Sequence, residues 1–567
     1  MSGGGKDGWK GVCEARVGKY LSRIASLIPG SRSGKKESRE EEENDPFFEY
    51  IESLPGASEL KGFDGRFTTL RDVDVVYRLN GGSYAHIWYE EGEKRLRYDV
   101  IEPELDERFK KILDSLKRLM FLVLDAKPPE VEDVSSYLQE RFEYILSQYE
   151  VDLTYYEKRR LIYYLIRDMA YYERITPLLD DPHIEDISCN GLGIPIYVYH
   201  RLFGSMRTNI LFEDEKELDS LTIRIAQRCG RHISISMPLL DAALPEGSRV
   251  SLTLSKEVTM RGSTTSIRKF RIEPITPPML TAIGSISPQM LAYLWILIEN
   301  KSSILVAGEV ATGKTTLLNA FSLFIPPDMK IISIEDTPEI QLPHENWIPA
   351  ITRSGFGASI ISGISGISGL GMRRRGEITM LDLLKSSLRQ RPDYVILGEV
   401  RGEEATVLFQ AIATGHLALT TMHGSSPRAI IQRLESPPMN IPPVMIDSLN
   451  CICMQARIKY QDKMVRRTTL ITEVVGYDFE RDEVRINDLF RWNPSDDSFE
   501  FSGKSHLLER IAYYAGLEPE DVYAELERRA RVIEWLADSG ITETFELSRI
   551  VAEYYHNPDD VLARMEE

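Results

Sequence analysis

The sequence predicts an α/β protein whose core is a doubly wound parallel sheet. Between residues 286 and 490, near-continuous apolar runs alternate with helix-competent stretches. Such runs are typical of parallel strands buried on both faces, and the βα alternation indicates a doubly wound sheet. The first run leads straight into a glycine-bounded turn. The runs occupy residues 304–307, 330–334, 394–398 and 417–421, and the turn occupies residues 308–316.

The turn has the G-x-x-x-x-G-K-[ST] spacing of a phosphate-binding loop, in the strand–turn–helix context that such a loop needs. Its small residues let backbone N–H groups surround phosphate oxygens at a positive helix terminus. Lys314 would contact the β- and γ-phosphates, and the hydroxyl of Thr315 would bind Mg²⁺. The sequence therefore predicts a nucleoside triphosphate site; a glycine-rich turn that binds nothing is the alternative. The other candidates in the loop are Gly308, Thr312, Gly313 and Thr316.

Polar side chains follow the other three apolar runs. Glu335 and Asp336 follow the second run, and Glu399 follows the third. His423 comes directly after the fourth run, whereas His416 stands before it. Ligands of open parallel sheets bind outside the carboxyl ends of the strands, so we expect these groups around the phosphates. One of these carboxylates could orient the attacking water, and Asp336 could hold the Mg²⁺ shell. For any single carboxylate, the alternative is a helix cap or an exposed residue of a turn.

Length and charge limit the class of protein. A chain of 567 residues is too long for one core, and we expect three or four domains. No apolar run approaches the ~20 residues that cross a bilayer, so a cytoplasmic location is expected. The net charge is −19, with 87 acidic and 68 basic residues, which makes nucleic acid a poor default partner. The five cysteines contain no C-x-x-C pair, so we expect no structural zinc, with Cys451 and Cys453 on opposite faces of one strand.

The chain divides into six predicted segments. Residues 9–28 place apolar side chains at helical spacing with basic residues between them, which suits either an anionic membrane surface or packing on the protein itself. A Gly/Ser/Ile-rich loop at 356–376 is expected to be a mobile surface loop or a partner contact. The segments are a basic amphipathic helix with an acidic disordered linker (1–46), a β and then helical N-terminal region (47–178), an α/β domain (179–275), a linker (276–289), the sheet domain (290–490) and a C-terminal helical appendix (491–567).

Four motifs resemble those of the secretion ATPase superfamily, which drives type II secretion, type IV pili and the archaellum. The segments GEVATGKTT, IISIEDTPEI, RPDYVILGEVRG and GHLALTTMHGSSPRAIIQRL resemble its Walker A, Asp-box, Walker B and His-box motifs. The sequences of four further segments resemble the archaeal GspE-like branch most: LPEGSRV, SIRKFR, LPHENW and SLRQRPDY. The resemblance spans roughly residues 60 to 560, and the tetracysteine zinc module of the bacterial type II branch is missing.

The resemblance implies a RecA-like P-loop NTPase core that binds ATP and Mg²⁺. A PAS-like α/β domain would precede this core, after the N-terminal mixed α/β region and before the helical appendix. Glu399 would activate the water, with Glu335 near it, and His416 and His423 match the two His-box positions. Glu309 departs from the family's small residue and adds a negative charge near the phosphates; we expect it to point outward.

The resemblance also implies a homohexamer in which the preceding domain of one subunit covers the nucleotide of its neighbour. Arg249 and Arg268 would complete that site in trans, and Arg389 and Arg391 are further candidates; solvated arginines are the alternative. Such a motor works on a polytopic membrane platform protein from the cytoplasmic face. A RecA-like nucleic-acid translocase and a non-hydrolysing nucleotide-gated scaffold are the competing hypotheses.

Overall fold

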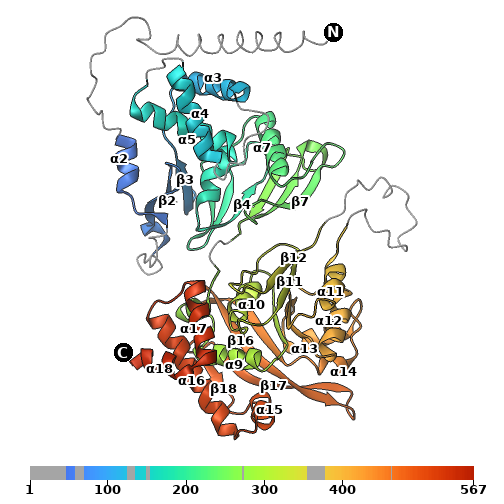
Figure 1. Ribbon diagram of the computed structural model, residues 1–567. Coiled ribbons are helices and arrows are strands. Elements are labelled where there is room, and N and C mark those ends of the chain that lie inside the picture. The colour runs from blue at the N-terminus through green and yellow to red at the C-terminus, as the bar shows by residue number, and fades with distance from the viewer. Residues whose placement is uncertain are drawn as a thin grey trace, which may run out of the picture. The chain divides into compact units, whose positions relative to one another are not determined.

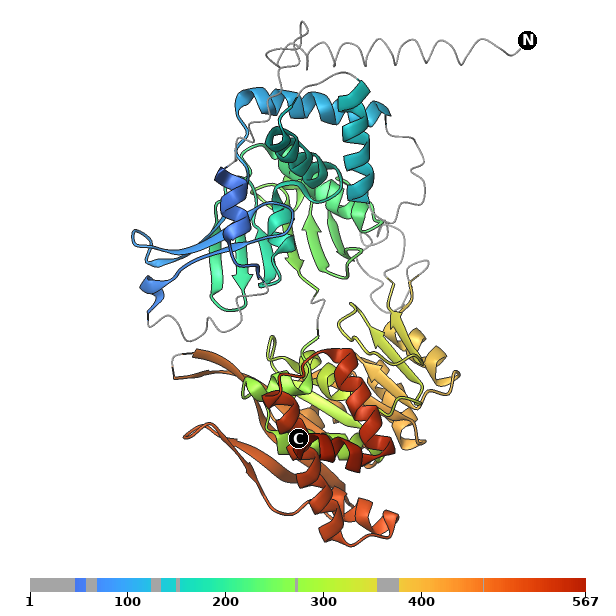
Figure 2. The ribbon, with the colours of Figure 1, turned by 60° about the vertical axis from the view of Figure 1, so that its left-hand side comes forward.

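The structure is a computed structural model that describes residues 46–57, 69–123, 134–148, 153–270, 274–353, 377–461 and 463–566. It consists of two compact units, Met1–Phe270 and Arg271–Glu567, which we describe separately (Figures 1 and 2). The predicted amphipathic helix, nearly all of the acidic linker and the Gly/Ser/Ile-rich loop lie outside the described residues. Within the described ranges, no helix has both the length and the apolarity to cross a membrane.

The first unit contains one nine-stranded sheet in the order β1-β2-β3-β6-β5-β4-β9-β8-β7. Neighbouring strands are antiparallel except β3 and β6, which run parallel and pair through Arg97↔Arg207 and Tyr98↔Thr208. The strands that we expected in a separate N-terminal region therefore share a sheet with the α/β domain. The open edge of β3 would expose unpaired backbone groups, and β6 satisfies them. The strands are β1 (Asp74–Arg78), β2 (Tyr84–Glu90), β3 (Arg95–Ile101), β4 (Ile184–Cys189), β5 (Tyr197–His200), β6 (Gly204–Thr208), β7 (Leu239–Ala243), β8 (Arg249–Thr253) and β9 (Thr264–Arg268).

A buried carboxylate also ties the early strands to the later ones. Asp181, just before β4, is fully buried and accepts hydrogen bonds from the hydroxyls of Tyr77 on β1 (2.5 Å) and Tyr98 on β3 (2.7 Å). The backbone N–H of His183 donates to the other oxygen of this carboxylate at 2.8 Å. A buried carboxylate needs such donors, so the contact favours one arrangement of the two halves of the sheet.

Five helices of the first unit contribute to two separate apolar clusters. Helices α6 and α7 pack on the sheet, whereas α3, α4 and α5 form a separate apolar cluster of their own. The helices are α2 (Pro46–Ser53), α3 (Glu107–Val123), α4 (Val134–Gln148), α5 (Tyr155–Met169), α6 (Thr176–Asp180) and α7 (Glu215–Arg228), with short 3₁₀ turns at Leu70–Asp72, Glu173–Ile175 and Ser255–Glu257.

The second unit contains a nine-stranded sheet in the order β12-β11-β13-β14-β10-β15-β16-β17-β18. The six strands from β12 to β15 in this order are parallel, and β16, β17 and β18 add an antiparallel extension. The strand that enters the P-loop, β10, is separated from β13 by β14, as in RecA-like folds. All four predicted apolar runs are strands of this sheet. The strands are β10 (Ile304–Gly308), β11 (Ile331–Glu335), β12 (Trp347–Ile351), β13 (Tyr394–Leu397), β14 (Leu417–His423), β15 (Cys451–Tyr460), β16 (Lys463–Asp478), β17 (Glu483–Asn493) and β18 (Ser498–Phe501).

Helices cover both faces of the parallel part of this sheet (Figure 1). On β10, Ile304 and Val306 face one apolar cluster and Leu305 and Ala307 face the other. The first cluster includes α8 to α10 and the C-terminal helices, and the second includes α11 to α14. The helices are α8 (Pro277–Ala282), α9 (Pro288–Glu299), α10 (Lys314–Ser322), α11 (Met380–Leu388), α12 (Glu404–Ala413), α13 (Pro427–Glu435), α14 (Pro443–Ile446), α15 (His506–Ala515), α16 (Pro519–Asp538), α17 (Thr544–His556) and α18 (Pro558–Glu566).

The placement that we expected for the two strand cysteines was wrong. Cys451 and Cys453 are both buried in the first cluster, while Ile452 and Met454 belong to the second. Residues two apart on a strand share a face, because side chains alternate with a period of two. No group of three metal-binding side chains occurs in the parts of the chain that the structure describes.

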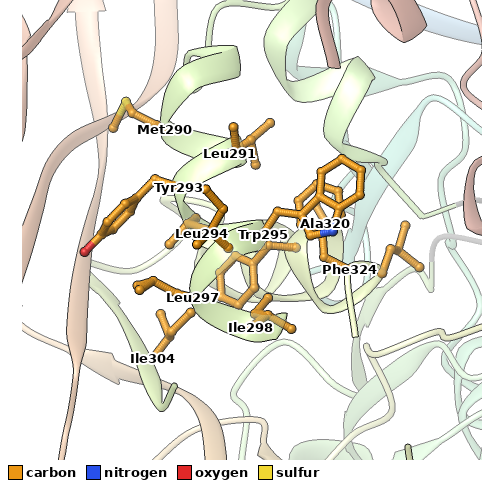
Figure 3. Packing of buried hydrophobic residues seen from close by; sticks show 14 of the residues in the cluster. Met290, Leu291, Tyr293, Leu294, Trp295, Leu297, Ile298, Ile304, Ala320 and Phe324 are labelled. Carbon is orange, nitrogen blue, oxygen red and sulfur yellow. The ribbon is translucent and has the colours of Figure 1, made fainter. Parts of the chain in front are cut away.

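The C-terminal helices are part of this core. Helix α16 packs on α9, where Trp295 stacks on Phe324 with ring centroids 4.9 Å apart (Figure 3). The guanidinium of Arg529, on α16, lies 4.9 Å from the centre of the Trp295 ring. The residues that we expected as an appendix also include part of β17 and all of β18, and the expected linker contains α8, whose Leu280 is buried. Periodic helical sequence does not reveal whether a helix stands apart or covers a sheet.

Candidate nucleotide site

The P-loop connects β10 to α10, and two glycines fix its path. A Cβ at Gly308 would lie 2.1 Å from the carbonyl oxygen of Gln455, so the adjacent strand β15 leaves no room for a side chain. Gly313 caps α10 with φ 92°, a left-handed conformation that other residues rarely adopt. The loop thus leads from a buried strand into the amino end of a helix, where backbone N–H groups and the helix dipole favour an anion.

Lys314 is the first residue of α10 and its side chain is buried. Its Nζ donates to the carbonyl oxygen of Glu309 at 2.7 Å and lies 3.4 Å from Nδ1 of His423. Thr312 is buried and donates to the same carbonyl oxygen at 3.0 Å. Thr315 and Thr316 follow in the first turn of α10 and are half-buried, whereas Glu309 is exposed, as expected.

His423 connects the P-loop lysine to the carboxylate of Glu399. It ends β14, where its Cα is the register partner of Gly308 on β10. Its Nδ1 lies 3.4 Å from Nζ of Lys314, and its Nε2 lies 3.0 Å from Oε1 of Glu399. The predicted Walker A, His-box and Walker B groups therefore meet in one continuous series of contacts.

Arg401 lies on the outer side of Glu399. Its Nη2 is 2.9 Å from Oε2 of Glu399 and 3.8 Å from Oδ2 of Asp336. Asp336 is exposed and also accepts a hydrogen bond from the hydroxyl of Thr352 at 3.0 Å. The guanidinium thus joins the carboxyl ends of β11 and β13.

Glu335 is buried at the end of β11, with 3% of its surface exposed. Its Oε1 accepts hydrogen bonds from the backbone N–H groups of Glu339 (2.9 Å) and Ile340 (3.0 Å). Burial raises the pKa of this carboxyl to about 7, because desolvation disfavours the charged form. A Cβ at Gly398 would lie 3.2 Å from Cγ of Glu335, so this carboxyl packs against the residue that precedes Glu399.

Three sequence candidates do not join this cluster. His416 precedes β14, at the opposite end of the strand from His423, and the seven residue steps along the strand place the two about 20 Å apart. Its Nδ1 is buried and has no hydrogen-bond partner among the described residues. Arg389 and Arg391 are exposed between α11 and the amino end of β13, which is also the far edge of the sheet.

Arg249 and Arg268 lie side by side in the first unit. Arg249 begins β8 and Arg268 ends β9, and their Cα positions are direct register partners. On the other side of β9, Arg268 is the register partner of Asp186. Both arginine side chains are exposed. Like charges directly opposite on adjacent strands are unfavourable by themselves, so this pair is a candidate anion-binding feature.

Three residues that the sequence did not predict surround the P-loop, from β15, from β16 and from the segment before α9. Gln455 is buried on β15, where Nε2 donates to the hydroxyl of Ser285 at 3.3 Å and Oε1 accepts from Thr468 at 2.9 Å. Arg466 on β16 donates from Nε to the carbonyl oxygen of Ala311 in the loop at 3.2 Å. The sequence of β15 and β16 is rich in basic residues, but this composition does not predict that the two strands lie beside the P-loop.

The family model for the type II/IV secretion system protein matches residues 181–491, more than half of the chain. The chain belongs to the type II/IV secretion ATPase family. Uncharacterized protein MJ0900 of Methanocaldococcus jannaschii is 34% identical over 513 residues, which cover 86% of this chain and 90% of that protein. Uncharacterized protein MJ1287 of the same organism is 57% identical over 285 residues, half of this chain and all of that protein. The solved VirB11 ATPase from the Brucella suis type IV secretion system is 25% identical, covers 52% of this chain and 91% of its own, and has a TM-score of 0.26.

Proposed function

We propose that this ATPase is a Mg²⁺-dependent, homohexameric motor that powers type II-like secretion or the assembly of a type IV pilus-like or archaellum-like filament. The observation that supports it is the series of contacts from Lys314 through His423 to Glu399. A lysine for phosphate and a carboxylate for water, each in contact with one histidine, have the composition that phosphoryl transfer needs. Hydrolysis depends on positioning and charge neutralisation rather than on covalent chemistry, and this edge of the sheet supplies both.

Each residue has a proposed role in the reaction. Lys314 contacts the β- and γ-phosphates, and His423 hydrogen-bonds the γ-phosphate. Glu399 orients the attacking water and accepts its proton, while Glu335, with its pKa near 7, lies behind it as a second acceptor. Arg249 and Arg268 are proposed to act on the nucleotide of a neighbouring subunit.

The residues at the loop are compatible with Mg²⁺. This ion keeps several waters and is bound through one or two protein ligands together with substrate phosphates, so a three-ligand cluster is not required. The hydroxyl of Thr315, next to Lys314 in the first turn of α10, is the proposed ligand. Asp336 is the weaker candidate, since its carboxylate faces Arg401 and Thr352. The ion would neutralise charge on the β- and γ-phosphates.

The proposed partner is a polytopic membrane platform protein, contacted from the cytoplasmic face. Hydrolysis would displace rigid units of the hexamer and so move the platform. A nucleic-acid translocase is the competing function, and the net charge of −19 disfavours it. Salt-dependent DNA binding in a filter assay would favour that alternative.

The test of the proposed function separates binding from turnover. Lys314→Ala should abolish tight ATP binding, whereas Glu399→Gln should retain binding and lower the rate of phosphate release about 10²- to 10⁴-fold. Glu403→Gln is a matched control, because this exposed glutamate lies four residues from Glu399 and outside the contact series. Wild-type turnover in Glu399→Gln would contradict the assigned role.

Two further measurements test the assembly and the partner. If arginines act in trans, turnover per subunit should rise with protein concentration, and Arg249→Ala or Arg268→Ala should slow turnover more than they weaken binding. A concentration-independent rate would indicate a self-sufficient monomer. Pull-down from solubilised membranes with Glu399→Gln as bait should recover an integral membrane protein, and its absence would contradict the platform hypothesis.

A further inference from the structure

The hairpin of β15 and β16 extends past the P-loop. The last residue of β10, Gly308, pairs with Gln455, and β15 continues for five residues to Tyr460. At about 3.3 Å per residue, the hairpin projects about 16 Å beyond the paired part of β10. Figure 2 shows this hairpin extending away from the body of the second unit. It stands at the same edge of the sheet as the phosphate-binding loop.

The two faces of this hairpin differ in chemistry. Gln455 and Thr468 are paired at its base, followed on the same face by Arg457 paired with Arg466 and by Lys459 paired with Met464. The face that begins beside the P-loop is therefore basic.

The opposite face carries Ile458 paired with Val465, and Tyr460, whose ring lies 6.3 Å from that of Trp492. It also carries buried Arg467, which donates to both oxygens of Asp497 at 2.8 Å. These contacts anchor the hairpin to the sheet extension and leave the basic face toward the loop.

Arg466 is the member of the basic face that contacts the loop. Its Nε donates to the carbonyl oxygen of Ala311 at 3.2 Å, and a Cβ at Gly313 would lie 3.3 Å from its Cδ. Its side chain is exposed. A guanidinium carries five N–H donors on a planar group, and the bond to Ala311 uses one of them.

The order of the strands assigns the two ends of the nucleotide. Glu399 follows β13 and His423 ends β14, and both strands lie on one side of β10, whereas β15 and β16 lie on the other side. With the γ-phosphate beside His423, the chain of phosphates crosses the loop and the nucleoside emerges toward the hairpin.

We propose that the basic face of the β15–β16 hairpin forms the wall of the nucleotide site beside the nucleoside, with Arg466 stacked on the base. Arginine suits this position because its planar, delocalised cation stacks on aromatic rings and can still donate hydrogen bonds to ribose oxygens. The inference rests on the proposed function, since it assumes that the P-loop binds a nucleoside triphosphate.

The test compares ligands with and without a nucleoside. Calorimetric titration of the full chain with ATP, ADP and inorganic tripolyphosphate gives three affinities for each variant. Arg466→Ala should weaken ATP and ADP about 10-fold each and leave tripolyphosphate within twofold of wild type. Arg466→Lys keeps the charge but loses the planar group, so it should show most of the same loss. Arg491→Ala is the matched control, because this exposed arginine lies on β17 and pairs with Asp488 instead.

Two results would overturn the inference. Equal weakening of tripolyphosphate would mean that Arg466 acts only by shaping the loop through Ala311. Unchanged affinities for all three ligands would place the hairpin outside the site. Failure of the assumption that the P-loop binds a nucleoside triphosphate would differ from both, because the wild-type protein would then bind none of the ligands.

Discussion

Replacing Glu335 by Gln should make the protein more stable at alkaline pH and less active at once. The substitution preserves the shape of the side chain, and the amide oxygen of Gln can still accept from the N–H groups of Glu339 and Ile340. What it removes is a negative charge in a site that is 97% buried, since only 3% of the residue is exposed. If Glu335 takes part in hydrolysis, the protein keeps a destabilising buried charge because activity requires it. Glu335→Gln should then raise the free energy of unfolding and lower the rate of hydrolysis, and the two can be measured separately.

The magnitude follows from the pKa of Glu335, which burial raises from 4.5 to about 7. Between these values the folded state holds a proton that the unfolded state has lost, so the free energy of unfolding falls as pH rises. The contribution of this carboxyl is fully present below pH 4.5 and lost above pH 7. At about 1.36 kcal/mol per pKa unit, the wild type should lose roughly 2 kcal/mol between pH 5 and pH 8 that Glu335→Gln does not lose.

Urea unfolding at pH 5, 6, 7 and 8 measures this difference directly. Tryptophan fluorescence suits the second unit, which contains Trp295, Trp347, Trp492 and Trp535. The informative quantity is the change with pH in the difference between variant and wild type, because other effects of the amide do not depend on pH. Asp336→Asn is the matched control, since it makes the same carboxylate-to-amide change at the next residue, whose side chain is exposed.

Two outcomes would refute this reasoning. A difference between Glu335→Gln and wild type that stays constant from pH 5 to pH 8 would mean that burial does not shift this carboxyl. Wild-type hydrolysis by Glu335→Gln would show that the buried carboxyl only holds the loop after β11, through the N–H groups of residues 339 and 340.

Three further substitutions test the packing that supports the site. Gly308→Ala should abolish binding of a fluorescent ATP analogue, because its Cβ would lie 2.1 Å from the backbone oxygen of Gln455, whereas Gly92→Ala, with no atom within 4 Å, should bind normally. Arg529→Met should lower the free energy of unfolding of the second unit by about 2–3 kcal/mol, since it removes the cation paired with Glu299, leaves Glu525 paired with Arg528 and removes the contact over Trp295; a loss under 0.5 kcal/mol in urea titration would contradict this. Tyr98→Phe should destabilise the first unit by about 1–2 kcal/mol, because the buried carboxylate of Asp181 loses a donor, and an unchanged urea midpoint would exclude that role.

The parallel strands and the P-loop could be predicted because their signals are local. A strand buried on both faces needs a near-continuous apolar run, and β10, β11, β13 and β14 each have one. The phosphate-binding turn has its glycines and lysine within nine residues. The carboxyl-edge rule then places Glu335, Glu399 and His423 at one edge without any knowledge of long-range contacts.

The rule that ligands bind at the carboxyl ends of parallel strands also places His416 away from His423. Both histidines flank β14, and a parallel strand has only one carboxyl end, so a seven-residue strand cannot bring both to the phosphates of one chain. The expected placement of Cys451 and Cys453 failed for a related reason, because residues two apart on a strand share a face. In both cases the correct placement follows from the two-residue period and the rise per residue of a strand.

Other features depend on contacts between distant segments. The parallel pair of β3 and β6 joins residues more than 100 positions apart, and Arg466 reaches a loop residue 155 positions away. No local pattern specifies such partners. The C-terminal helices were recognisable as helices, but their packing on α9 depends on how Trp295, Phe324 and Arg529 fit together.

The contacts behind the P-loop show how a change at the phosphates can reach the segment that follows the first unit. Gly308 packs against the carbonyl oxygen of Gln455, and the side chain of Gln455 donates to Ser285, whose own carbonyl oxygen accepts from the N–H of Thr468 at 2.7 Å. Ser285 lies only fifteen residues after Phe270, where the first unit ends. Because the gap at Gly308 is too small even for a methyl group, the loop backbone cannot move toward β15 without displacing Gln455. A closely packed contact followed by two hydrogen bonds therefore joins the phosphate-binding loop to the start of the second unit, which is the mechanical connection that a motor needs.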